Sequence, residues 1–336
     1  MKNHCFVAVV CMLLLVSEFV LGQSGTLHKL SDINIRDPYI LVDKRSSTYY
    51  LYKTSSVKTN DGNVLGGVEA YKSKDMENWE GPVRVFTVPE DNWITGNVWA
   101  PEVHLYEGKY YLFATLNSDI QWKKQQKDWA LFTFRGTQIF YSDSPEGPFL
   151  AFDLLPHTPM DWMALDGTLW VEDGQPYMIF CHEWVQVEDG TMELVALAPD
   201  LSIPLWGTLK LFHASAADWS TGSTSTPKSY VTDGCFLYKT KTDKLLMIWS
   251  SFMNGEYATG IAESVTGKVT GPWRQQKEPL FTKDSGHGMI FKTLDGRLCI
   301  TFHGPNNPSG KERAHIYELE DVGNTIVLKG KISGDH

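Results

Sequence analysis

Short apolar runs recur in pairs along this chain, and a polar residue opens each pair. Five copies are present, beginning at Asp37, Glu102, Asp166, Asp233 and His287. In each copy a polar turn, such as residues 107–109 or 295–297, separates two runs rich in Tyr, Phe, Leu, Ile and Met. An apolar run, a turn and a second apolar run predict a β-hairpin. The first four copies follow one another at nearly equal intervals, so the chain is predicted to repeat one β unit.

A fainter repeat follows four of the hairpins, starting at Tyr71, Tyr141, Leu197 and Ala262. Each copy has a polar turn and ends at Gly-Pro or Trp, which indicates two further strands. Four strands for each of five copies predict an all-β, five-bladed β-propeller. The apolar runs alternate only weakly, which is typical of strands buried on both faces between neighbouring blades.

The N-terminus has the layout of a secretory signal. Lys2 precedes an apolar stretch at residues 5–16, and Val20, Leu21 and Gly22 come before Gln23. We expect a signal peptide over residues 1–22, a single propeller domain over 23–336, and an exported protein with no membrane attachment after cleavage. An uncleaved membrane span is the alternative, but residues 17 and 18 shorten the apolar run below the roughly 20 residues a span needs.

Composition narrows the class of ligand. The formal net charge is −10, which argues against nucleic acid and anionic membranes as partners, because both require a basic face. Twelve Trp residues offer flat apolar faces on which sugar rings can pack. Cys181, Cys235 and Cys299 follow the signal, each in or beside an apolar strand. This odd count favours packed thiols, with one disulfide as the alternative.

The residues that open the five hairpins carry the candidate chemistry. In a propeller the innermost strands surround one axis, so four carboxylates and one imidazole are expected to crowd one funnel. Crowded acids raise one another's pKa, a cost that usually marks a functional site. The reaction that most naturally uses carboxylates alone is glycoside cleavage, in which an inverting acid and base stand roughly 6.5 to 9.5 Å apart. The alternative is that these acids only cap blade turns.

These motifs resemble glycoside hydrolase family 43. The similarity lies in RDPYI at 36–40, VWAPE at 98–102, LDGTL at 165–169, TDG at 232–234 and GHGMIF at 286–291. The resemblance implies a secreted, inverting enzyme that needs no cofactor and removes terminal arabinofuranose, xylose or galactose from plant-type carbohydrates. It also implies that Asp37 is the general base, Asp166 tunes the acid, and Asp233 is the general acid. His287 matches a central histidine that often lies beside a water-filled metal site, commonly calcium.

One position departs from the family pattern. The family usually has Glu followed by Gly-Pro where this chain has Asp233, Gly234 and Cys235, and Asp is one methylene shorter. Glu183, at the end of a predicted strand, is the reserve candidate for the acid, although a rim carboxylate is the alternative. The same departure keeps open a catalytically weak or silent carbohydrate-binding propeller.

Other residues are candidates for binding substrate. Trp99 could stack on a sugar or pack between blades, and Glu102 could line the hub or satisfy backbone groups. Arg135 lies in the long polar and aromatic insertion at 117–136, and long loops in compact folds tend to be functional. His182 and His303 could line the pocket, although a histidine at a strand end is more often structural.

Overall fold

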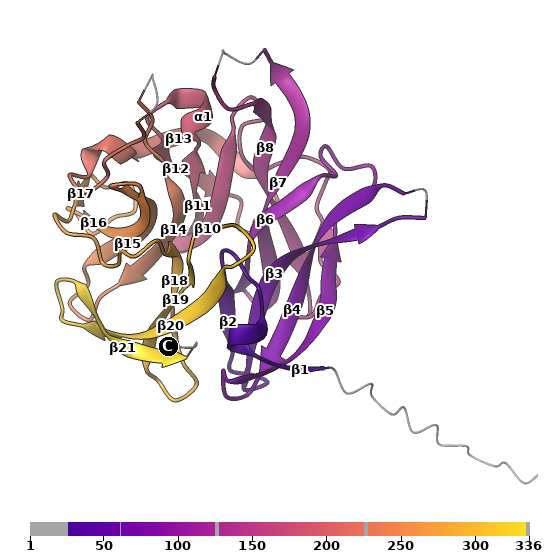
Figure 1. Ribbon diagram of the computed structural model, residues 1–336, viewed down its shortest axis with the longest axis horizontal. Helices are drawn as coiled ribbons and strands as arrows, with labels where there is room; N and C mark the ends of the chain where they lie inside the picture. The colour runs from indigo at the N-terminus through magenta and orange to yellow at the C-terminus, as the bar shows by residue number, and fades with distance from the viewer. Residues whose placement is uncertain (1–25, 61, 125–127, 225–227, 334–336) are drawn as a thin grey trace, which may run out of the picture.

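The computed structural model describes residues 26–60, 62–124, 128–224 and 228–333. The predicted signal peptide, residues 1–22, lies outside them. Within the described part, five antiparallel sheets surround a central axis, which confirms the predicted five-bladed β-propeller (Figure 1). Among these residues no helix is long and apolar enough to cross a membrane, and α1 (Trp184–Val187) has four residues.

Each blade uses the predicted hairpin as its two inner strands. In blades I to IV the fainter repeat covers the end of the third strand and the turn that leads to the fourth, and blade V has two outer strands although the repeat was not identified there. Blade I contains β2 (Tyr39–Asp43), β3 (Thr48–Lys58), β4 (Val64–Ser73), β5 (Asn78–Thr87) and, at its outer edge, β1 (Leu27–Lys29). Blade II contains β6 (Asn97–Tyr106), β7 (Lys109–Lys123), β8 (Phe132–Ser142) and β9 (Leu150–Ala151). Blade III contains β10 (Ala164–Glu172), β11 (Gln175–His182), β12 (Thr191–Leu197) and β13 (Pro204–His213). Blade IV contains β14 (Asp233–Lys239), β15 (Leu245–Met253), β16 (Glu256–Ser264) and β17 (Trp273–Gln275). Blade V contains β18 (Gly286–Lys292), β19 (Leu298–Gly304), β20 (Arg313–Asp321) and β21 (Ile326–Ser333). Two 3-10 turns, η1 (Leu30–Asp32) and η2 (Ala214–Ala216), complete the described elements.

The hydrophobic core lies between blades. One cluster packs Phe113 and Ile139 of blade II against Met178 and Phe180 of blade III. Another packs side chains of blade IV, including Ile248, against blade V. Inner strands are therefore buried on both faces, which explains their weak alternation. Cys181, Cys235 and Cys299 are free and buried, as the packed-thiol prediction expected.

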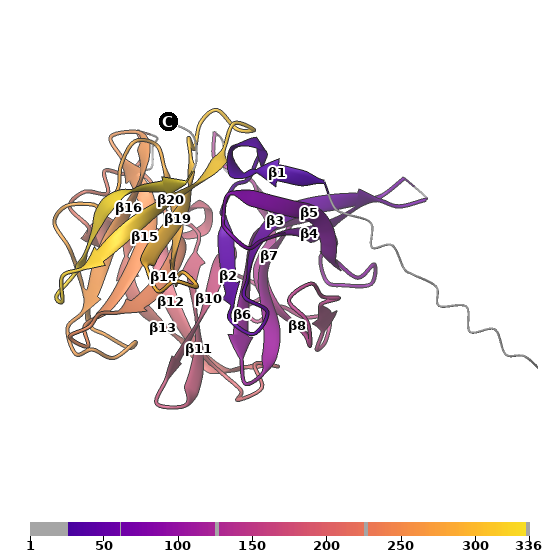
Figure 2. The same cartoon turned by 90° about the horizontal axis from the view of Figure 1, so that it is seen from below.

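The ring closes without exchanging a strand between its first and last blades, because blade V consists entirely of C-terminal strands. Side chains and a backbone bridge join the ends instead. Asn34 pairs with Arg313 of β20, and Asn34 Nδ2 donates hydrogen bonds of 3.0 Å to two carbonyls of blade V. Arg36 adds an ion pair with the buried Glu312, at 3.1 Å. Figure 2 shows the first described residues, around η1, lying beside β20, so the closure also positions Asp37, the next residue after Arg36.

Four of the five innermost strands, all except β2, contain a β-bulge, and the register of these bulges corrects one expectation. The bulges lie between Trp99 and Glu102 in β6, between Leu165 and Thr168 in β10, between Asp233 and Phe236 in β14, and between Gly286 and Met289 in β18. A residue with positive φ lies in each bulge and just before β2, and the set is Asp37, Ala100, Asp166, Gly234 and His287. Asp233 therefore precedes the equivalent position by one residue and Glu102 follows it by two. The prediction that all five polar residues are equivalent was wrong, because near-equal sequence spacing does not determine the bulge register.

Candidate active site

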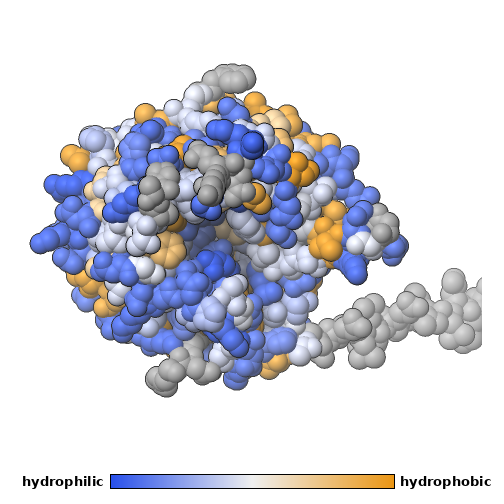
Figure 3. Space-filling view, turned by 45° about the horizontal axis from the view of Figure 1, so that its top comes forward, coloured by the Kyte–Doolittle hydropathy of each residue, from blue (hydrophilic) through white to orange (hydrophobic). Residues whose placement is uncertain are grey.

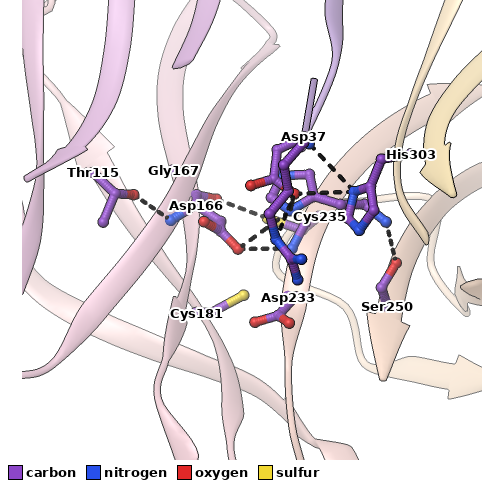
Figure 4. Close-up of polar contacts among 12 residues, drawn as sticks. Asp37, Thr115, Asp166, Gly167, Cys181, Asp233, Cys235, Ser250 and His303 are labelled. Carbon is purple, nitrogen blue, oxygen red and sulfur yellow. Dashed lines mark hydrogen bonds and ion pairs between the residues drawn. The ribbon is translucent and has the colours of Figure 1, made fainter. Parts of the chain in front are cut away.

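Three of the residues at these equivalent positions, Asp37, Asp166 and His287, meet at the axis. His287 Nδ1 lies 3.2 Å from Asp37 Oδ1 and 3.7 Å from Asp166 Oδ2. Their positive φ values are unusual for residues other than glycine and need support from neighbours. The Asp166 N–H donates to Thr115 Oγ1 at 2.9 Å, and the His287 N–H donates to Ser250 Oγ at 2.8 Å. Hydroxyls of neighbouring blades therefore hold the bulges in place (Figure 4).

Asp233 joins this group from one residue before its bulge. Its Oδ2 accepts a hydrogen bond of 2.9 Å from the Tyr257 hydroxyl, and the N–H of the next residue, Gly234, donates to Asp166 Oδ2 at 3.0 Å. Figure 4 shows Asp37, Asp166 and Asp233 converging from separate strands. The structure thus brings together the three predicted catalytic carboxylates and His287.

Burial and neighbouring charges shift the pKa values of these carboxyls in opposite directions. Burial opposes the ionisation of Asp37, but the imidazoles of His287 and His303 outweigh it and hold the pKa of Asp37 well below its usual value. Burial raises the pKa of Asp166 to about 7, and the charges of Asp233 and Asp37 add to this rise. Burial also raises the pKa of Asp233, and His287 only partly offsets it. An ionised carboxylate therefore lies beside Asp166, which holds its proton up to near neutral pH, and beside Asp233, whose pKa is also raised.

His287 has the opposite balance. Burial disfavours its imidazolium, but Asp37, Asp166 and Asp233 outweigh that effect and raise its pKa. Among the described residues, no group of three or more His, Cys, Asp or Glu is arranged to hold a metal ion. His287 Nδ1 is directed at two carboxylates, and one imidazole supplies none of the oxygens that calcium prefers. A calcium ion at the propeller centre stays a prediction.

Two residues that sequence reasoning undervalued complete the hub. His303, near the end of β19, is fully buried. Its Nδ1 lies 3.2 Å from Asp37 Oδ1 and also 3.2 Å from the backbone nitrogen of Asp37. The Tyr257 ring stacks on His303 at 5.6 Å between centroids. His303 carried a weak signal as a strand-end histidine, whereas Tyr257 carried none, because it begins an ordinary apolar strand.

A second polar cluster lies between blades II and III. Arg135 forms an ion pair with the buried Glu183, and its Nε donates to Asn117 Oδ1 at 2.8 Å. The guanidinium carbon lies 4.5 Å from the centroid of the Trp99 ring, in a cation–π contact. Burial raises the pKa of Glu183 to about 7 against the pull of Arg135, and the charge of Asp233 adds to the rise. Glu183 is therefore a buried acid that interacts with the hub, not a carboxylate on the rim.

Two other candidates have partners of their own. Glu102 Oε2 lies 2.8 Å from His104 Nε2, and His104 Nδ1 lies 3.2 Å from the Tyr39 hydroxyl. This chain of contacts supports a structural role for Glu102. His182 stacks on Trp162 at 4.1 Å, and its Nε2 lies 2.9 Å from Gln186 Oε1.

A groove of about 830 Å³ opens next to the hub. It is bordered by residues 128–130 of the predicted insertion, by Trp184 of α1, by part of the segment at 221–231, and by the turn between β15 and β16. The rings of Trp129 and Trp184 meet edge to face at 5.4 Å. Phe252 lines the groove, and its ring centroid lies 5.3 Å from that of the buried Tyr257 ring, so side-chain contacts link the wall of the groove to Asp233. Figure 3 shows one face of the molecule hollowed near its centre, with mainly hydrophilic residues around the opening.

Known proteins share this architecture. The family model described as glycosyl hydrolases family 43 matches residues 31–320. An endo-arabinase from Bacteroides thetaiotaomicron is 40% identical, with a TM-score of 0.76 over 87% of this chain and 96% of that one. A thermostable family-43 glycoside hydrolase is 21% identical, with a TM-score of 0.72 over 94% of this chain and 97% of that one. The extracellular endo-α-(1→5)-L-arabinanase 1 of Bacillus subtilis is 29% identical over 90 residues, which span 25% of this chain and 25% of that protein. The chain therefore belongs to glycosyl hydrolase family 43.

Proposed function

We propose that this protein hydrolyses α-1,5-linked L-arabinan by a single displacement that inverts configuration. The observation that carries the proposal is the hub itself, in which an ionised Asp37 faces carboxyls whose pKa values are raised by burial. An inverting glycosidase needs one ionised base and one protonated acid at the same pH. The 40% identity to an endo-arabinase over 87% of this chain supports arabinan as the substrate, and the α-1,5 linkage is the one in the name of the Bacillus subtilis relative.

In the proposed reaction Asp37 removes a proton from a water molecule. The water oxygen forms a bond to the anomeric carbon while the bond from that carbon to the glycosidic oxygen breaks. A protonated carboxyl on the opposite side of the sugar donates its proton to the departing oxygen. The charge of Asp166 interacts with those of Asp37 and Asp233, so Asp166 tunes the pKa values of the hub carboxyls. His287 and His303 hold Asp37 in its ionised form.

The groove beside the hub supports cleavage within the polymer, in place of the release of single terminal sugars that sequence alone suggested. Trp129, Trp184 and Phe252 line the groove, and aromatic side chains of this kind can pack against sugar rings. Phe252 on the groove wall contacts the Tyr257 ring, and the Tyr257 hydroxyl contacts Asp233, so the groove lies close enough to the hub for one polysaccharide chain to extend over both regions. We also propose that the protein acts outside the cytoplasm, because the matched arabinanase of Bacillus subtilis is named as an extracellular enzyme.

The test uses linear α-1,5-arabinan, with β-1,4-xylan and β-1,4-galactan as matched polymers. We expect arabinan to yield oligosaccharides of mixed length and an inverted anomeric signal by proton NMR. Arabinose as the sole product would refute internal cleavage, and retained configuration would refute the mechanism. Binding of arabinan in an affinity gel without any cleavage would favour a carbohydrate-binding propeller instead.

A further inference from the structure

The carboxyls opposite Asp37 differ in how they are held. Asp166 Oδ2 accepts the Gly234 N–H at 3.0 Å and lies 3.7 Å from His287 Nδ1. Asp233 Oδ2 accepts the Tyr257 hydroxyl at 2.9 Å. Both carboxylates thus have an oxygen that accepts a hydrogen bond from a neighbouring group of blade IV. Both are aspartates, whose side chains extend less far from the backbone than that of a glutamate.

Glu183 follows β11 directly, at the end of blade III that borders the groove. In the β10–β11 ladder Cys181 pairs with Leu165 and His182 with Ala164, and the Glu183 N–H donates to the Met163 carbonyl at 2.8 Å. Glu183 is therefore beyond Asp166, toward the start of β10. The next residue, Trp184, lines the groove. Because its backbone pairs with Met163, just before β10, and its neighbour Trp184 lines the groove, Glu183 lies at the boundary between the hub and the groove.

This boundary is where the leaving oxygen of a polymeric substrate must lie. If one sugar occupies the hub and the following sugars occupy the groove, the glycosidic oxygen between them is next to Glu183. A general acid must be within hydrogen-bonding reach of that oxygen. Glu has one more methylene than Asp233, which extends its reach from the wall toward the bond that breaks.

The contacts of Glu183 suit both of its charge states. Arg135 pairs with Oε2, and no hydrogen bond to Oε1 is present among the described residues, so Oε1 can carry a proton. Burial and the charge of Asp233 favour the protonated form, and Arg135 stabilises the carboxylate once the proton has left. Asn117 and the Trp99 ring hold the guanidinium in place. Glu183 can thus lose and regain a proton near neutral pH.

We propose that Glu183, not Asp233, donates the proton to the leaving oxygen, and that Arg135 is its positioning residue. The Oε1–H bond breaks, the proton passes to the glycosidic oxygen, and that oxygen keeps the electron pair of the broken bond to the anomeric carbon. Asp233 then acts in the hub, beside Asp166 and Tyr257. This inference rests on the proposed function.

The test compares leaving groups in Glu183→Gln and Asp233→Asn. The substrates are linear α-1,5-arabinan, a poor leaving group, and the 4-nitrophenyl glycoside of α-1,5-arabinotriose, whose phenolate leaves without protonation. For Glu183→Gln we expect kcat on arabinan to fall about 100- to 10,000-fold, kcat on the nitrophenyl substrate to stay within about tenfold, and the basic limb of the pH profile to disappear. For Asp233→Asn we expect both substrates to slow by similar factors and the basic limb to remain.

Matched controls separate this role from a structural one. Glu193→Gln replaces another buried carboxyl of blade III, paired with Thr191, and should leave both rates unchanged. Glu183→Asp shortens the side chain and should slow arabinan cleavage while keeping the basic limb; if Glu183→Gln does not fold, this variant with the same two substrates decides the question. A leaving-group effect and a lost basic limb in Asp233→Asn, but not in Glu183→Gln, would overturn the inference. If the wild-type protein cleaves neither substrate, the proposed function fails instead.

Discussion

Replacing Asp37 with Asn is the sharpest test of the hub. Asn has nearly the same size, and it tolerates the positive φ of 51° at this position better than most residues. It cannot accept a proton from water. The fold should therefore survive, and the base should be lost.

The magnitude follows from the role of a general base. Such a group typically contributes 10²- to 10⁴-fold to the rate, which corresponds to about 3 to 5 kcal/mol of barrier. His287 and His303 keep the pKa of Asp37 low, so the wild-type base is ionised throughout the neutral range. The loss in Asp37→Asn should therefore be similar at every pH from about 5 to 8.

The assay is kcat/KM on linear arabinan, with folding followed by circular dichroism and thermal unfolding. Asp295→Asn is the matched control, because Asp295 lies in the exposed turn between β18 and β19. Its carboxylate accepts hydrogen bonds from Thr293 and Arg297. We expect this control to keep full activity. Wild-type turnover by a folded Asp37→Asn protein would refute the assignment of the base.

Two further predictions concern stability. Burial raises the pKa of Glu183 from 4.5 to about 7, so its contribution to stability is complete below pH 4.5 and is lost as the pH rises through about 7. The thermal midpoint of the wild-type protein should decrease as the pH is raised from 5 to 8. In Glu183→Gln this decrease should be smaller, by an amount that corresponds to up to about 3 kcal/mol in unfolding free energy. An equal decrease in both proteins would contradict the raised pKa. Gly260→Ala should destabilise the protein by about 1 to 3 kcal/mol in urea unfolding, because the added methyl group overlaps the buried Trp219 ring. Gly330→Ala is its control, since a methyl group there meets no atom within 4 Å, and equal loss in both variants would refute the packing argument.

Much of the hub could be predicted from sequence because its residues begin the repeating hairpins. Asp37, Asp166 and His287 begin inner strands of blades I, III and V, and the structure places them within hydrogen-bonding or ion-pairing distance. Glu102 also follows the spacing, yet it pairs with His104, two residues later on the same strand. The period identifies the strand, but the bulge decides which of its residues points to the axis.

The remainder of the site depends on contacts between blades that have no period. Tyr257 reaches Asp233 from the third strand of blade IV, and His303 reaches Asp37 from the second strand of blade V. Arg135 meets Glu183 across blades II and III, 48 residues apart. Nothing in the local sequence of either partner specifies the other.

By itself, the sequence determined the number of blades, the pairing of strands within each blade and the family, because apolar runs and turns are local features whose spacing repeats. Only the tertiary structure decided which carboxyls share the axis, which of them ionise, and where Glu183 lies. Those properties depend on bulge register, on burial and on the distance between charges from different blades. Such terms exist only after the five sheets have packed around their axis.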